Sequence, residues 1–111
     1  MAATPPSPED LLFREPTPLG FSVCTTRRYW DLLCRKHPEI ADKQAEIRRC
    51  LREPQEVRRS RQDPQVYLFY RPYPPYHLAV VVRRLNSEGF IITSYLTDRI
   101  KEGERIWPAS A

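Results

Sequence analysis

The second half of the chain carries the clearest pattern of hydrophobic and polar positions. Between Glu56 and Thr97, β-branched and aromatic residues gather in runs separated by short turn sequences rich in Pro, Asp, Asn and Gly. Consecutive runs of this kind, joined by short turns, predict antiparallel hairpins rather than crossover units. The four predicted strands are residues 56–61, 66–71, 76–85 and 89–97.

The last two of these strands indicate how the sheet is covered. Ala79–Val82 is continuously apolar, which predicts a central strand that is covered at least partly on both sides. Residues 89–97 alternate as a half-buried strand does, so one set should face the helices and the other an open face. The first set is Phe90, Ile92, Ser94 and Leu96, and the second is Ile91, Thr93, Tyr95 and Thr97.

Two helices are predicted before the strands. Thr25 or Thr26 can cap a helix that runs to about His37, where the following Pro38 ends it. A second helix is predicted from about residue 39 to residue 52, with arginines in its last turn, where the helix dipole favours positive charge. The apolar residues of both segments recur at helical spacing, so each helix has one face for a core.

These elements predict a single α+β domain at residues 19–107. Two N-terminal helices are expected to pack on one face of a four- to five-stranded antiparallel sheet, with residues 19–25 as a short first strand. Residues 1–18 hold five prolines, which predicts a flexible arm, and residues 108–111 are a short tail.

Composition narrows the class of protein. The chain of 111 residues suits one domain, and no apolar run approaches the roughly 20 residues of a membrane span. The N-terminus lacks the features of a signal peptide, so a cytoplasmic protein without a membrane partner is expected. Three cysteines at wide spacings predict reduced thiols rather than disulfides or a zinc site, and three glycines form no phosphate-binding loop. We therefore expect no metal and no cofactor.

Positive charge points toward a nucleic-acid partner. The formal net charge is +4, and arginine accounts for most of the basic residues. Arginine presents a planar fork that matches phosphate and stacks on bases. Six arginines lie between Arg48 and Arg61, at a predicted helix end and the next strand. A basic stripe on a small domain predicts RNA binding, although an arginine-rich solvated surface gives the same composition.

Several short motifs occur in the order of a known superfamily. A His-Pro pair ends the first helix, a V-R-x-S strand follows, then a Tyr-Arg strand and a T-x-Y-x-T strand. In this order they resemble the nuclease-like domains of phages and bacterial toxin systems in the metal-independent superfamily of barnase, EndoU, the tRNase colicins and RelE. The resemblance covers roughly residues 20–107. It implies a RelE- or barnase-like fold and a ribonuclease that cleaves RNA by attack of the 2′-hydroxyl on the neighbouring phosphate.

The resemblance also implies a set of site residues. In such a reaction a base takes the 2′ proton, an acid protonates the leaving oxygen, and cations hold the developing charge. His37 or Tyr70 would move protons, and Arg58 and Arg71 would hold the phosphate. Polar groups that would orient the RNA, and arginines that would add affinity, complete the set: Ser60, Thr93, Tyr95, Arg48 and Arg52.

Each assignment has a structural alternative. His37 closes an apolar helix face and suits a half-buried core histidine, and tyrosines are favoured in sheets for packing alone. Three functions therefore remain open: a toxin- or phage-associated ribonuclease neutralised by an acidic antitoxin or immunity protein, a non-catalytic nucleic-acid-binding module, and a protein-interaction domain that uses the turn Arg71–Tyr76. The sequence does not define the oligomeric state.

Overall fold

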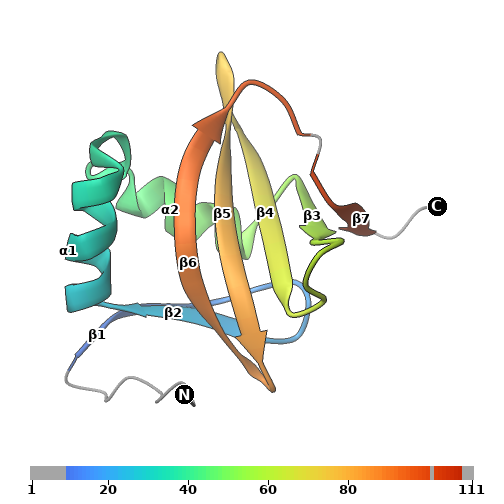
Figure 1. Cartoon of the computed structure of the whole chain (residues 1–111), viewed down its shortest axis with the longest axis horizontal. Helices are drawn as coiled ribbons and strands as arrows, with labels where there is room; N and C mark the ends of the chain where they lie inside the picture. Colours follow the sequence, from blue (N-terminus) through green and yellow to red (C-terminus); the bar gives the residue numbers. More distant parts are fainter. Residues whose placement is uncertain (1–9, 101, 109–111) are drawn as a thin grey trace.

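The structure, a computed structural model, describes residues 10–100 and 102–108. These residues form one seven-stranded sheet with two α-helices and a 3-10 helix (Figure 1). The order of strands across the sheet is β1-β2-β6-β5-β4-β3-β7. The strands are β1 Leu11–Pro16, β2 Ser22–Thr26, β3 Glu56–Arg59, β4 Val66–Tyr73, β5 Tyr76–Leu85, β6 Glu88–Thr97 and β7 Glu104–Trp107, and the helices are α1 Arg27–Lys36, η1 Pro38–Ile40 and α2 Gln44–Arg52.

The predicted fold class is wrong in the number of strands in the sheet and in how the strands are connected. The sheet is mixed and has seven strands rather than four or five, and strand residues far outnumber helical ones. Two strands, β1 and β2, precede the helices instead of one, and β2 pairs with β6 in parallel. Local patterns predict hairpins well, because both strands are close in the sequence. The parallel pair joins Ser22 to Glu88, which are far apart in the sequence, so no local pattern predicts it.

Strand β1 lies in the segment whose proline content predicts a flexible arm. Its Phe13 is buried, and so is Glu15, whose carboxylate lies 2.6 Å from Arg48 Nε and 3.2 Å from Arg52 Nη1. Pro16 ends the strand at the edge of the sheet, where a missing N–H is tolerated. The rest of the predicted arm, residues 1–9, and residues 109–111 lie outside the described residues.

Capping and proline set the limits of the helices. The Thr26 hydroxyl caps α1 by accepting a hydrogen bond from the Tyr29 amide at 3.1 Å, and His37 is the C-cap residue, as the sequence predicts. Pro38 then begins the 3-10 helix η1, so α2 starts only at Gln44 rather than near residue 39.

The sheet has a covered face and an open face. On the covered face α2 packs behind β4 and β5, while α1 stands beside the edge of β6 (Figure 1). The main core joins both helices to alternate residues of the strands, among them Val57, Phe69, Leu78, Val80 and Val82. The residues between them form a second, smaller apolar cluster on the open face: Leu68, Tyr70 and Ala79, with Val81, Tyr95 and Ile100 packed against them.

A β-bulge changes the predicted alternation of β6. Val82 pairs with Ile91, but Val81 pairs with Thr93, so Ile92 is an extra residue in the ladder. Ile91 consequently joins the core on the covered face, contrary to the prediction, while Thr93 and Tyr95 stay on the open face.

All three cysteines are free thiols, with Cys24 and Cys50 buried and Cys34 half-buried. Burial raises the pKa of Cys24 to about 11, helped by nearby Glu88, which keeps this thiol protonated and unreactive. Among the described residues there is no helix with the length and apolar character needed to cross a membrane.

Candidate functional site

The open face carries a hollow of about 610 Å³, which we call the open-face hollow. Apolar side chains of β4 and β5 contribute Leu68 and Val81 to its lining. Polar groups come from three separate segments that surround them: the turn after β3, strand β6 and the segment between β6 and β7. The polar lining residues are Ser60, Arg61, Gln62, Tyr95 and Glu102.

The register of β3 places the V-R-x-S motif on this face. Arg58 is paired with Leu68, which belongs to the open-face cluster, whereas Val57 is paired with Phe69 of the main core. Ser60, two residues after Arg58, lines the hollow. Its Oγ accepts hydrogen bonds from the amides of Gln62 and Asp63, so its own hydroxyl proton is left to donate to a ligand.

Arg58 holds the C-terminal segment against the sheet. Its Nε donates to Glu56 Oε2 at 2.6 Å, and its Nη1 donates to the Gly103 carbonyl at 3.3 Å. Part of its charge is thus neutralised by Glu56. Arg61, at the rim of the same hollow, makes no ion pair with any residue that the structure describes, so it is the free cation here.

Gly103 allows the segment after β6 to close on β3. Its φ is +80°, and a Cβ there would lie 2.6 Å from the Arg59 carbonyl oxygen. Only glycine accepts both the left-handed backbone and this close approach. The close approach fixes the position of the neighbouring Glu102 at the hollow, and Ile100 packs on the apolar cluster of the same face.

Two phenols meet beside the hollow. Tyr70 is only 1% exposed, and burial raises its pKa, as do the nearby Tyr95 and Glu102, while Arg58 opposes the shift. Burial also raises the pKa of Tyr95, and the negative charge of Glu102 adds to this effect. The interaction between the two phenols raises the pKa of Tyr70 further and works against the rise for Tyr95. Both phenols therefore remain protonated at neutral pH.

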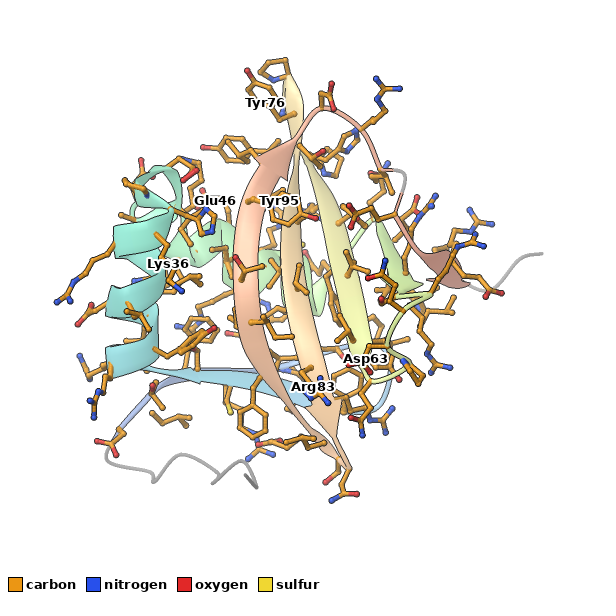
Figure 2. All side chains as sticks on the ribbon, viewed as in Figure 1. Lys36, Glu46, Asp63, Tyr76, Arg83 and Tyr95 are labelled. Atoms are coloured by element: carbon orange, nitrogen blue, oxygen red, sulfur yellow. The ribbon has the colours of Figure 1, made fainter. Side chains whose placement is uncertain are left out.

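A charged pair stands at the end of the face nearest the β3–β4 turn. Arg83 Nη1 lies 2.8 Å from Asp63 Oδ2, and Figure 2 shows both side chains at the lower end of the sheet, below Tyr95. The Gln65 amide also donates to Asp63, and these contacts lower the pKa of its carboxyl group. Asp63 is thus an anion that stabilises the turn between β3 and β4.

The structure does not bring every predicted site residue to the open face. Arg71 follows Tyr70 on β4, so it points to the other side, where its Nη1 donates to the Glu53 carbonyl at the end of α2. Arg48 and Arg52 pair with Glu15 and hold β1 on α2. These three arginines stabilise the fold on the covered side.

His37 and Thr93 meet in a second hollow. It measures about 300 Å³, lies between α1 and β6, and is lined by both residues together with Lys36 and Tyr29. The His37 ring is about one-third exposed, with Nδ1 3.9 Å from Glu39 Oε1. His37 is therefore neither sealed in the core nor part of the open-face hollow.

Glu102 and Arg61 were not predicted as site residues, yet both line the open-face hollow. Glu102 lies in a stretch of mixed charge just before residues 104–107, which form β7 and pair with β3. The signal that was available is Gly103, one of three glycines in the chain, which marks a close backbone approach next to an acidic residue. The described residues contain no cluster of His, Cys, Asp and Glu suited to a metal ion.

Comparison of the chain with protein-family models, with curated proteins and with solved structures gave no match.

Proposed function

We propose that the open face binds single-stranded RNA and cleaves it without a metal ion, by attack of a 2′-hydroxyl on the adjacent phosphate. The observation that carries this proposal is the grouping of a guanidinium, two protonated phenols and a carboxylate on the one face that the helices leave open. They are Arg58, Tyr70, Tyr95 and Glu102.

Phosphate binding falls to the cations of the hollow. Arg61 is free to contact a phosphate. Arg58 lies on the same face, with its Nε bonded to Glu56 and its Nη1 to the Gly103 carbonyl, so its Nη2 is left for a ligand. Guanidinium groups form two parallel hydrogen bonds to phosphate oxygens and stabilise the charge that develops on them during the reaction. The Ser60 hydroxyl can donate to a third oxygen.

Proton transfer falls to Glu102 and Tyr95. The Glu102 carboxylate takes the proton of the 2′-hydroxyl, the 2′ oxygen bonds to phosphorus, and the bond to the 5′ oxygen breaks. Tyr95, protonated at neutral pH, gives its proton to the leaving 5′ oxygen. The products are a 2′,3′-cyclic phosphate and a free 5′-hydroxyl, after which Glu102 returns its proton to Tyr95 through water. Tyr70, deeply buried, supports Tyr95, which packs against it on the open face.

The test is incubation of the pure protein with mixed RNA in EDTA, followed by analysis of the RNA ends. Cleavage should leave 2′,3′-cyclic phosphates, and both Glu102→Gln and Tyr95→Phe should slow it on the order of a hundredfold or more. Glu104→Gln, on exposed β7, is the matched control and should leave the rate unchanged. No cleavage by the wild-type protein, or equal rates for all variants, would reject the proposal.

Binding without cleavage is the second candidate. The 2.6 Å ion pair between Arg58 and Glu56 favours it, because a guanidinium already paired with a carboxylate offers less charge to a transition state. In that case the protein would bind RNA with an affinity that falls as salt rises and would leave the RNA intact.

A further inference from the structure

The hollow between α1 and β6, called here the α1–β6 hollow, is separate from the open-face hollow but adjoins it. Its lining includes Tyr29, Leu32, Lys36 and His37 from the helix side and Thr93 from β6. Thr93 pairs across the sheet with Val81, which lines the open-face hollow. The two hollows therefore meet along β6.

The spacing along β6 fits a continuous ligand. Thr93 and Tyr95 lie on the same face two residues apart, which is about 7 Å along a strand. One nucleotide unit of an extended RNA chain covers such a span. Figure 2 shows Lys36 on the side of α1 that faces β6 and Tyr95 over the open face of the sheet, so a strand passing Tyr95 can reach Lys36.

The side chains of the α1–β6 hollow suit the parts of a nucleotide. Lys36 is exposed and has no ion-pair partner anywhere in the described part of the chain, so its charge is available to a phosphate. His37 adds a second, titratable donor beside it. Thr93 supplies a hydroxyl from the strand.

An aromatic ring is held at the rim of this hollow. The Tyr29 hydroxyl donates to the Ile92 carbonyl at 2.5 Å, which fixes the ring while 37% of the residue stays exposed. Leu32, one helical turn on, is 45% exposed. A fixed aromatic beside a cation is the arrangement on which single-stranded nucleic acids stack their bases without regard to sequence.

We propose that the α1–β6 hollow is a second nucleotide subsite, which holds the nucleotide next to the one bound at the open-face hollow. Lys36 contacts its phosphate, and the base stacks on Tyr29. This inference rests on the proposed function, since it extends the same RNA path by one unit.

The test uses 2′-O-methyl oligouridylates, which cannot be cleaved because the attacking hydroxyl is blocked. Binding of a mononucleotide and of a tetranucleotide is measured by fluorescence anisotropy at several salt concentrations. Lys36→Gln should weaken binding of the tetranucleotide about three- to tenfold. It should also reduce the slope of log affinity against log salt by about 0.7, the value for one phosphate contact on a single strand. Mononucleotide binding should not change.

Lys43→Gln is the matched control, because Lys43 pairs with Asp42 at 3.1 Å and lies outside the α1–β6 hollow. It should leave both affinities unchanged. If Lys36→Gln binds the tetranucleotide as the wild type does, or weakens both ligands equally, the subsite is rejected while the proposed function stands. If the wild-type protein binds neither oligonucleotide, the proposed function and the subsite are both rejected.

Discussion

The two faces of the central strands are built from alternate residues of the same segments but are held in different ways. On β5, Val80 is fully buried under α2, whereas its neighbour Val81 is only half-buried on the open face. The covered face is closed mainly by aliphatic and aromatic packing, with ion pairs from Arg48 and Arg52 to Glu15 at its border. The open face is partly covered by a segment that polar contacts hold in place, from Arg58 to Gly103.

This difference explains why the candidate site lies on the open face. The core side chains of the covered face, Val57, Phe69 and Val80 among them, are fully buried. The buried polar group Ser94 serves the fold there by donating to the Ala79 carbonyl at 2.7 Å. On the open face the polar groups border a hollow and are within reach of a ligand. Predictions that separate the two faces therefore test the location of the site.

The largest effect is expected when one arginine on each face is replaced by alanine. Arg58→Ala should slow RNA cleavage on the order of a hundredfold or more, because it removes a charge that stabilises the transition state. Arg71→Ala should leave the rate unchanged and instead lower the free energy of unfolding by about 1–2 kcal/mol, since the Glu53 carbonyl loses its charged donor. Single-turnover cleavage and urea unfolding measure the two effects. The reverse result would place the site on the covered side.

A smaller effect is expected from the neighbouring valines of β5. Val80→Ala should lower the free energy of unfolding by about 2–3 kcal/mol, because it leaves a cavity in a sealed core. Val81→Ala should lower it by less than about 1 kcal/mol, since its side chain already borders the open-face hollow. Equal losses in denaturant unfolding would show that the open face is as tightly packed as the covered one.

Gly103→Ala tests how the open face is closed. The new Cβ would meet the Arg59 carbonyl, and the left-handed backbone would be strained, so stability should fall by about 1–2 kcal/mol. The segment would also move away from β3, so cleavage should slow together with the loss of stability. As a control, Gly20→Ala has a similar φ of +84° but meets no atom within 4 Å, and should lose stability without losing activity.

The smallest effect concerns alkaline pH. An unfolded tyrosine has a pKa of about 10, and the folded-state pKa of Tyr70 and of Tyr95 is raised by burial. The unfolded chain therefore loses these protons first, so stability present below pH 10 should decline as the pH rises above it. Tyr95→Phe should flatten the decline in urea unfolding measured between about pH 9 and 11. Tyr76→Phe, at the exposed tip of the β4–β5 hairpin (Figure 2), should keep it.

Hairpins and caps were predictable because their causes are local. The strands β4, β5 and β6, the Thr26 cap and the stop at Pro38 all follow from turn residues, periodicity and capping chemistry within a few positions. Strand β1 was not predictable, because its buried Glu15 is tolerated only where Arg48 and Arg52 reach it from α2. The bulge at Ile92 reversed the face on which Ile91 lies, and no glycine at that position indicated a bulge in the sequence.

The candidate site was predictable only in part, for the same reason. Alternation alone groups Arg58 with Ser60 and separates Arg71 from Tyr70, but the sequence does not say which group faces outward. That depends on where α2 packs. Glu102 enters the site through contacts of Gly103 with β3, which join parts of the chain more than 40 positions apart. Long-range backbone approach of this kind leaves no periodic signal.

The parallel pairing of β2 with β6 affects how the chain can fold while it is being synthesised. During synthesis β2 leaves the ribosome long before Glu88–Phe90, its partners in the sheet, have been translated. Until then β2, with its buried Val23, lacks the strand that pairs with it on the side away from β1. The sheet can be completed only after β6 emerges, so we expect nascent chains that end before residue 88 to be the most prone to aggregation and to chaperone binding.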